Sequence, residues 1–170
     1  MKQLQKQLVE FYVQFHQHQH YFLCHDILED VWKSQSKFTK NDPIVALILI
    51  ATGCYHHRRE NYIGAHRSFQ KAIRLLQRHS ASDFVQLGVH HDLLYQTLEQ
   101  FLEHTEQKRS FSPLILPLTN EMTETILKYE PEYRPLTKII STPMLIHHHK
   151  LRDRSDVISA RQQAQQNKKR

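Results

Sequence analysis

Apolar residues recur every three or four positions in the first part of the chain, which is the spacing of one face of an α-helix. This spacing predicts a first helix over about 3–19 and a second over about 21–34. Residues 34–41, which follow, are polar and have the composition of a loop. The apolar face of the first helix consists of Leu4, Leu8, Phe11, Tyr12 and Phe15.

The third predicted helix, over residues 43–59, is apolar on every side. Asp42 followed by Pro43 marks its start, because aspartate caps free backbone N–H groups and proline at the first helical position loses no hydrogen bond. A helix that is apolar all round is stable in water only when other elements cover it. We therefore expect it at the centre of the fold, followed by an amphipathic helix over about 62–78.

A fifth helix is expected from Ser82 or Asp83 to about residue 105, because apolar residues continue there with helical spacing. The character of the chain changes beyond Gln107. Two prolines indicate an extended segment over 112–117, and a shorter helix is expected near 119–129.

Prolines also make residues 130–145 irregular in this interpretation. A polar helix is expected over 156–165, and disorder after it. The chain then divides into a helical bundle domain over 1–106 and a proline-punctuated extension over 107–170, which carries short helices and a basic tail.

The composition agrees with an all-α fold. The 170 residues include only three glycines, whereas sheet proteins need glycine for hairpin turns and bulges. Good helix formers such as Gln, Leu, Lys, Arg, Glu and Ala fill the chain. We therefore predict a compact bundle of about five helices, followed by an irregular, basic C-terminal extension.

The sequence gives no sign of export or of a membrane span. The N-terminal charges are not followed by an apolar run, so no signal peptide is expected. The longest uncharged stretch, residues 43–57, falls short of the roughly 20 apolar residues of a membrane helix. Cys24 and Cys54 lie in apolar helical patterns, where a free thiol acts as a small hydrophobe. A cytoplasmic protein without a membrane partner is expected.

The net charge of +6 is unevenly distributed. Residues 1–133 hold 14 Lys and Arg against 15 Asp and Glu, a net charge of −1. Residues 134–170 hold 9 against 2, a net charge of +7. The basic character therefore belongs to the tail, whose clearest positive charges are Lys150, Arg152, Arg154, Arg161, Lys168, Lys169 and Arg170.

Two stretches of the chain resemble a known family. Residues 25–32 read His-Asp-Ile-Leu-Glu-Asp-Val-Trp, and the apolar helix leads to Tyr-His at 55–56 and Asn-Tyr-Ile-Gly-Ala at 61–65. The two stretches together resemble the domain of unknown function 309 family over about residues 15–78. Its pattern is a His-Glu-x-x-Glu-x-x-Trp helix, an apolar helix, a histidine and an Asn-x-x-Gly-Ala turn. The resemblance implies a compact all-helical fold and brings no established activity.

The chain departs from the family pattern at four positions. Asp26 replaces the usual glutamate, and Ala46 and Leu49 stand where a glycine and a glutamine are often found. Glu60 stands where a glycine commonly precedes the asparagine. This last change makes the turn less permissive, because glycine adopts conformations that glutamate does not.

Four residues of this pattern form a candidate polar cluster in the core: His25, Glu29, Trp32 and His56. His25 and Glu29 are four apart and share a helix face, and His56 reaches them if the two helices pack antiparallel. The leading interpretation is a buried hydrogen-bond network that fixes how the helices dock. The alternatives are a zinc or iron site at His25, Glu29 and His56, and proton transfer by the same groups. No cofactor is expected under the leading interpretation.

Asn61 and Gly64 are expected to form the tight turn of a helical hairpin. Asparagine caps the next helix, and glycine allows close helix approach. A ligand-binding role for this turn is the alternative.

The other histidine groups are interpreted as solvated polar positions, because adjacent histidines rarely satisfy a tetrahedral metal site. His16, His18 and His20 alternate along the chain, and runs lie at 56–57, 90–91 and 147–149. A physiological metal site is the alternative, and the first and last groups are also able to bind metal adventitiously.

These patterns lead to three functional hypotheses. The first is a non-enzymatic interaction or scaffold protein whose basic tail docks on an acidic protein surface. The second is a metal-dependent, hydrolase-like enzyme that uses His25, Glu29 and His56. The third is a nucleic-acid-binding accessory protein that uses the tail, although few aromatic residues lie among its charges.

Overall fold

The computed structural model describes residues 2–141, and within them the fold is all-helical, as predicted. The polar helix expected over 156–165 and the basic tail at 150–170 lie outside the described residues. The helices in chain order are α1 (Lys2–Val13), α2 (Tyr21–Lys33), α3 (Pro43–Arg58), α4 (Tyr62–Arg78), α5 (Ala81–Val85), α6 (His91–Glu106) and α7 (Asn120–Tyr129), and a π-helical turn (Gln14–His18) follows α1.

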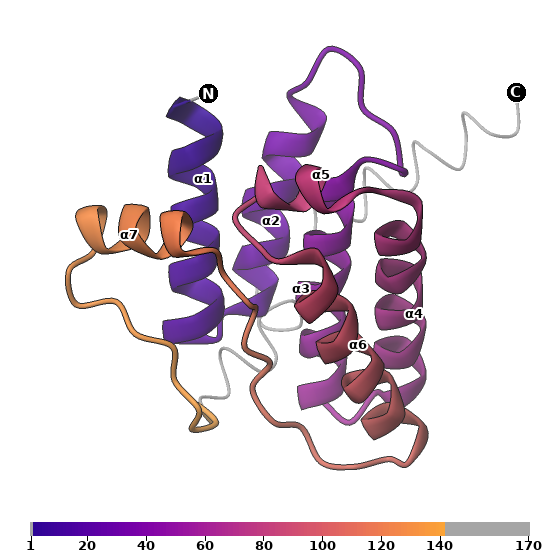
Figure 1. Cartoon of the computed structure of the whole chain (residues 1–170). Coiled ribbons are helices and arrows are strands. Elements are labelled where there is room, and N and C mark those ends of the chain that lie inside the picture. The colour runs from indigo at the N-terminus through magenta and orange to yellow at the C-terminus, as the bar shows by residue number, and fades with distance from the viewer. Residues whose placement is uncertain (1, 142–170) are drawn as a thin grey trace, which may run out of the picture.

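Helix α3 is the centre of the bundle, as its all-round apolar pattern predicts (Figure 1). Leu47, Ile50, Ala51 and Cys54 on it are fully buried. Helices α2 and α4 pack on it, and α6 packs on α4. No helix within residues 2–141 has the length and apolar character needed to cross a bilayer.

The single helix expected over about 82–105 is wrong, because the structure breaks it into α5 and α6. Gly88 lies between them with φ +89°, a left-handed conformation that ends a helix. Its carbonyl accepts a hydrogen bond from the Thr119 N–H at 2.8 Å, and Val89 forms an isolated antiparallel bridge with Leu118. The break is therefore held by a segment about 30 residues away in the chain.

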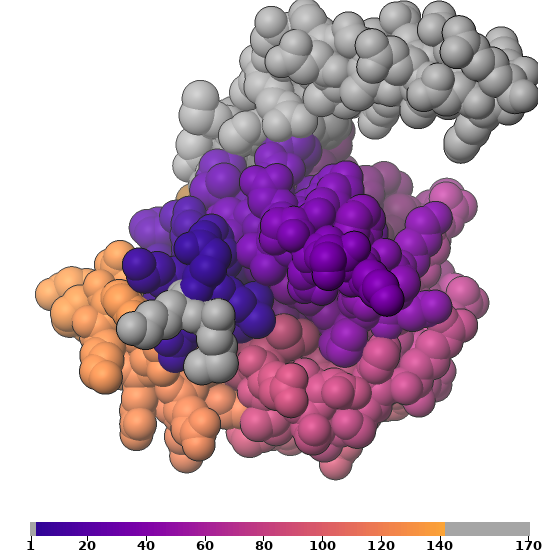
Figure 2. All heavy atoms as spheres, turned by 90° about the horizontal axis from the view of Figure 1, so that it is seen from above, coloured from indigo at the N-terminus to yellow at the C-terminus, as the bar shows by residue number. Residues whose placement is uncertain are grey.

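Residues 107–141 lie against the rest of the bundle. Helix α7 crosses α1 (Figure 1), and the view from above shows the first turns of α1 beside the α7 segment (Figure 2). The helix predicted near 119–129 is confirmed as α7, and residues 112–117 and 130–141 contain no helix, also as predicted. The boundary predicted after residue 106 concerns independent folding and stays a prediction. Buried core side chains from this segment are Phe111, Leu114, Leu116, Met122, Ile126 and Tyr133.

Candidate functional site

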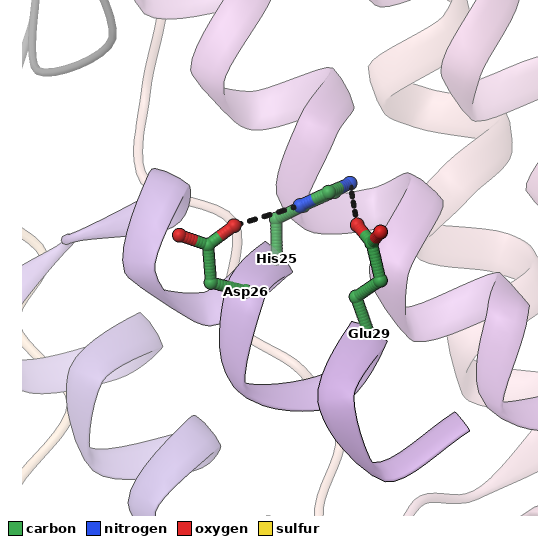
Figure 3. Close-up of side chains that lie close together, drawn as sticks. All are labelled: His25, Asp26 and Glu29. Atoms are coloured by element: carbon green, nitrogen blue, oxygen red, sulfur yellow. Dashed lines mark hydrogen bonds and ion pairs between the residues drawn. The ribbon is translucent and has the colours of Figure 1, made fainter. Parts of the chain in front are cut away.

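A histidine and two carboxylates meet on the exposed side of α2 (Figure 3). His25 Nε2 lies 3.2 Å from Glu29 Oε2, and His25 Nδ1 lies 3.3 Å from Asp26 Oδ1. The side chains of His25, Asp26 and Glu29 are 34%, 44% and 30% exposed, and Lys33 also forms an ion pair with Glu29. Among the described residues, these are the three His, Cys, Asp or Glu side chains whose ligand atoms lie within 4.8 Å of one another. The candidate metal group therefore contains Asp26, which the sequence interpretation treated only as a departure from the family pattern.

His56 lies outside this group, because it pairs with the turn that follows its own helix. Its Nδ1 lies 3.1 Å from the side-chain nitrogen of Asn61. Burial, and secondly the Arg59 guanidinium, lower the pKa of His56. The structure thus does not bring His25, Glu29 and His56 together as ligands, although α2 and α3 are neighbours.

Trp32 anchors the loop between α2 and α3 rather than bonding to Glu29. Its indole Nε1 donates to the Thr39 carbonyl at 3.0 Å and to Asp42 Oδ2 at 3.1 Å. Its ring also meets Phe38 edge-on, with centroids 5.1 Å apart. Asp42 is the residue before α3, but its side chain turns back to this loop and makes no cap hydrogen bond to the helix. Of the four predicted residues, only His25 and Glu29 contact each other, whereas Trp32 and His56 each bond to a different loop.

The turn between α3 and α4 matches its sequence prediction. Asn61 caps α4, because its Oδ1 accepts the Gly64 N–H at 3.0 Å. The Asn61 N–H donates to the His56 carbonyl at 2.9 Å and the Glu60 N–H to the His57 carbonyl at 3.0 Å, the hydrogen-bond pattern of a Schellman motif. A Cβ at Gly64 would lie 2.6 Å from Asn61 Nδ2 and 3.0 Å from His56 Cγ, so only glycine fits without a shift.

His16 is buried at 1% exposure, so its interpretation as a solvated position is wrong. Its Nε2 accepts the Leu116 N–H at 2.9 Å, which leaves the proton on Nδ1, 2.6 Å from the Tyr133 hydroxyl. Burial lowers the pKa of His16 to about 3, so the ring is neutral near pH 7. A sequence signal existed: His16 continues the i, i+4 stripe of Leu8 and Tyr12, both buried.

The chain around His16 ties the end of α1 to the C-terminal segment. The Leu136 N–H donates to the His16 carbonyl at 3.0 Å. Gln19 ends the π-helical turn with φ +51°, and its side chain bonds to the Lys138 carbonyl at 2.6 Å and the Ile140 N–H at 3.0 Å. Residues 136–140 are thus held by side-chain and backbone bonds rather than by a helix.

His57 is buried as well, and His91 is bonded, so neither is a simple solvated position. His57 Nε2 donates to the Arg109 carbonyl at 2.9 Å, and its ring contacts Phe111 with centroids 5.6 Å apart. Burial lowers the pKa of His57, although the hydrogen bond to the Arg109 carbonyl opposes the shift. His91 Nε2 donates to the Leu76 carbonyl at 2.6 Å.

The described fold is all-helical. The residues that carry the family pattern shape the two loops at the ends of α3: Trp32 bonds to the loop before it, and His56, Asn61 and Gly64 form the turn after it. The chain belongs to the family described as a domain of unknown function (DUF309), whose model matches residues 8–68. It is also 35% identical over 162 residues to the uncharacterized protein YpuF of Bacillus subtilis (strain 168), and the match covers 92% of each chain. Comparison with solved structures gives no significant match.

Proposed function

We propose that this protein is a non-enzymatic interaction protein that docks on an acidic protein surface through its basic tail. The observation that carries the proposal is the charge asymmetry of the sequence, with a net charge of +7 after residue 133 and −1 before it. Clustered positive charge steers association with acidic partners and makes binding sensitive to salt.

The contacts made by the residues of the family pattern support a binding protein over an enzyme. Trp32 holds a loop, and His56 and Asn61 bond to each other beside the cap of α4. An enzyme needs convergent polar groups in a concave site. Neither the groove of about 560 Å³ between α1, α5 and α7 nor the groove of about 310 Å³ between α4 and α6 is lined by Trp32, His56 or Asn61.

The test compares two full-length variants by affinity capture from lysate, followed by reconstitution with the purified partner. In the first variant glutamine replaces all seven tail residues named above, and in the second lysines and arginines are exchanged. We expect a nuclease-resistant, salt-sensitive partner that binds the wild type and the exchange variant but not the glutamine variant. Equal binding by the glutamine variant would refute the proposal. Loss of binding after nuclease treatment would favour the nucleic-acid hypothesis instead.

A divalent metal on α2 is the second candidate, and the grouping of His25, Asp26 and Glu29 favours it. An imidazole and two carboxylates suit zinc or iron, and such an ion would supply a Lewis acid for hydrolase-like chemistry. The Lys33 ion pair with Glu29 competes with metal, because the ammonium group occupies one carboxylate oxygen.

Titration calorimetry of untagged protein with Zn²⁺ tests this second candidate. Stoichiometric binding that is lost in His25→Ala and kept in His18→Ala would support it, because His18 is exposed and outside the group. Binding that survives His25→Ala, or no binding at all, would eliminate the metal-dependent hypothesis at this position.

A further inference from the structure

Helix α4 exposes a row of positive charge. Arg67, Lys71, Arg74 and Arg78 are spaced four, three and four residues apart, so they share one side of the helix, and all four are exposed. Helix α4 contains no Asp or Glu. Within residues 2–141, Arg67, Lys71 and Arg74 form no ion pair, and Arg78 donates to the amide oxygen of Asn41. We call these four residues the basic face.

The neighbouring helix α6 exposes a row of negative charge. Asp92, Glu99, Glu103 and Glu106 are spaced seven, four and three residues apart, and all are exposed. Helix α6 contains no Lys or Arg. We call these four residues the acidic face. The two rows lie on adjacent helices, yet within the described residues no Lys or Arg of α4 is paired with a carboxylate of α6.

Two hydrogen bonds fix how α4 and α6 align. Gln77 Nε2 donates to the Tyr95 hydroxyl at 3.0 Å, and His66 Nδ1 lies 3.3 Å from Thr105 Oγ1. The helices therefore run antiparallel, and both advance by about 1.5 Å per residue. At this register each positive side chain is level with a negative one: Arg67 with Glu103 and Glu106, Lys71 with Glu103 and Glu99, Arg74 with Glu99, and Arg78 with Asp92.

We infer that the α4–α6 surface binds a second copy of this chain in a two-fold symmetric dimer. A two-fold axis in the plane of this surface and parallel to the helices places α4 of each copy over α6 of the other. That rotation keeps every residue at its level along the helices. The basic face of each copy then meets the acidic face of its partner at matching positions, on both sides of the axis. An axis perpendicular to the helices would set α4 on α4 and oppose like charges.

The acidic face also explains why a nucleic acid is the poorer occupant. A polyanion attracted by Arg67, Lys71 and Arg74 would lie beside Glu99 and Glu103 and be repelled by them. A partner that carries the same pair of opposite rows complements both of them at once.

The surface also has an apolar element and a measurable size. Ile63 at the start of α4 is 76% exposed and borders a groove of about 310 Å³ between α4 and α6. Two helices of 17 and 16 residues cover roughly 25 by 20 Å, so a dimer would bury on the order of 1,000 Å² in total. This area is at the lower end for specific complexes, so we expect a reversible dimer. Because charge pairs hold it, its formation falls as the salt concentration rises.

Charge reversal with rescue tests the dimer. Variant one is Lys71→Glu with Arg74→Glu, variant two is Glu99→Arg with Glu103→Arg, and Lys37→Glu with Lys40→Glu is the control on exposed positions elsewhere. Sedimentation velocity of the full chain is run at about 0.05 M and 0.5 M salt, and circular dichroism checks that each variant is folded. We expect the wild type and the control to form a reversible dimer at low salt, and each reversed variant to dissociate at least ten-fold more readily.

An equimolar mixture of the two reversed variants restores opposite charge between residues 71 and 74 of one copy and residues 99 and 103 of the other, but it sets Arg67 of variant one level with the new positive charge at residue 103. We therefore expect the mixture to dimerise far more readily than either variant alone, though less tightly than the wild type. This rescue separates pairing of charges from loss of folding. A wild type that is monomeric at low salt over the whole accessible concentration range would overturn the inference. So would a dimer that both reversals leave unchanged, or folded variants whose mixture stays monomeric. Binding of the wild type to nucleic acid alone, lost in variant one, would assign the basic face to a polyanion.

Discussion

Replacing His16 with glutamine tests whether this buried, neutral histidine makes the fold sensitive to acid. In the folded state the pKa of His16 is lowered by burial from 6.5 to about 3, whereas the unfolded chain keeps the ordinary value. The unfolded state therefore binds the proton more readily as the pH falls. The stability that this group contributes is complete above the unfolded pKa and is lost progressively as the pH falls from 6.5 toward 3.

The size of the effect follows from this difference in pKa. Each unit corresponds to about 1.4 kcal/mol, so the full loss would approach ~5 kcal/mol near pH 3. Between pH 7.5 and pH 5.0 the His16 contribution to the free energy of unfolding falls by ~2 kcal/mol. The rings in contact with His16 are Tyr12, Phe15 and Tyr133, which carry no charge at these pH values. No carboxylate in these contacts offsets the loss.

Urea unfolding at pH 7.5 and pH 5.0 measures this loss in the wild type, in His16→Gln and in His18→Gln. His18 lies in the same π-helical turn and is exposed, so its variant controls for replacing a histidine of this turn that is not buried. We expect the pH-dependent loss to be ~2 kcal/mol smaller in His16→Gln than in the wild type, and unchanged in His18→Gln. Equal losses in all three proteins would refute the assignment of a neutral, structurally essential imidazole.

Three further predictions concern backbone strain, close packing and thiol access. Glu60→Gly raises the free energy of unfolding in urea by ~1 kcal/mol, because Glu60 has φ +63°, a left-handed conformation that strains residues other than glycine. Lys108, with φ +53°, gives the same result when replaced by glycine. A lower free energy of unfolding in both variants would contradict backbone strain at these positions. Gly64→Ala lowers thermal stability by ~1 kcal/mol or more through the contacts its Cβ would make, and an unchanged melting temperature would show that the turn yields. Cys24 and Cys54 are fully buried, and burial raises the pKa of both thiols. We therefore expect them to react with a thiol reagent only at the rate at which the protein unfolds. Fast labelling of the native protein would show that the thiols are accessible in the folded state.

The α3–α4 hairpin could be predicted from sequence because all its determinants are local. An unbroken apolar run fixes α3 as the core helix, and Asn61 with Gly64 three residues later specifies the cap of α4. Each of these signals lies within a few residues of the structure it determines, so no tertiary contact was needed to interpret it.

The errors occurred where a distant contact decides the outcome. Apolar spacing continues from Phe84 to Leu94 across the break between α5 and α6, and the break depends on bonds from Gly88 and Val89 to residues 118–119. The alternating histidines near residue 18 indicate a solvated segment by composition, yet His16 faces Leu116 and Tyr133, about 100 residues further along the chain.

The candidate site could not be fully predicted from the sequence either. The pattern places His25 on one helix and His56 on the next, but it does not fix which way the end of α3 points. The Schellman turn at Glu60 brings Asn61 back beside the end of α3, where its side chain bonds to His56. Asp26 and Glu29, one and four residues after His25, each bring a carboxylate to a different nitrogen of the imidazole, and helix spacing predicts only the Glu29 contact.

The family model matches the first part of the bundle and ends before most of the charged side chains of α4 and α6. The match covers residues 8–68 and therefore ends in the first half of α4, after Trp32, His56, Asn61 and Gly64. These residues hold a loop and a helix turn in place. Three of the four residues of the basic face, all of α6 and the basic tail lie beyond that match. The relative from Bacillus subtilis matches over 162 residues and therefore extends past the region of the family model. Replacing residues 71, 74, 99 and 103 of this chain with those of the relative, and measuring dimerisation, tests whether the relative's residues maintain the paired charges on α4 and α6.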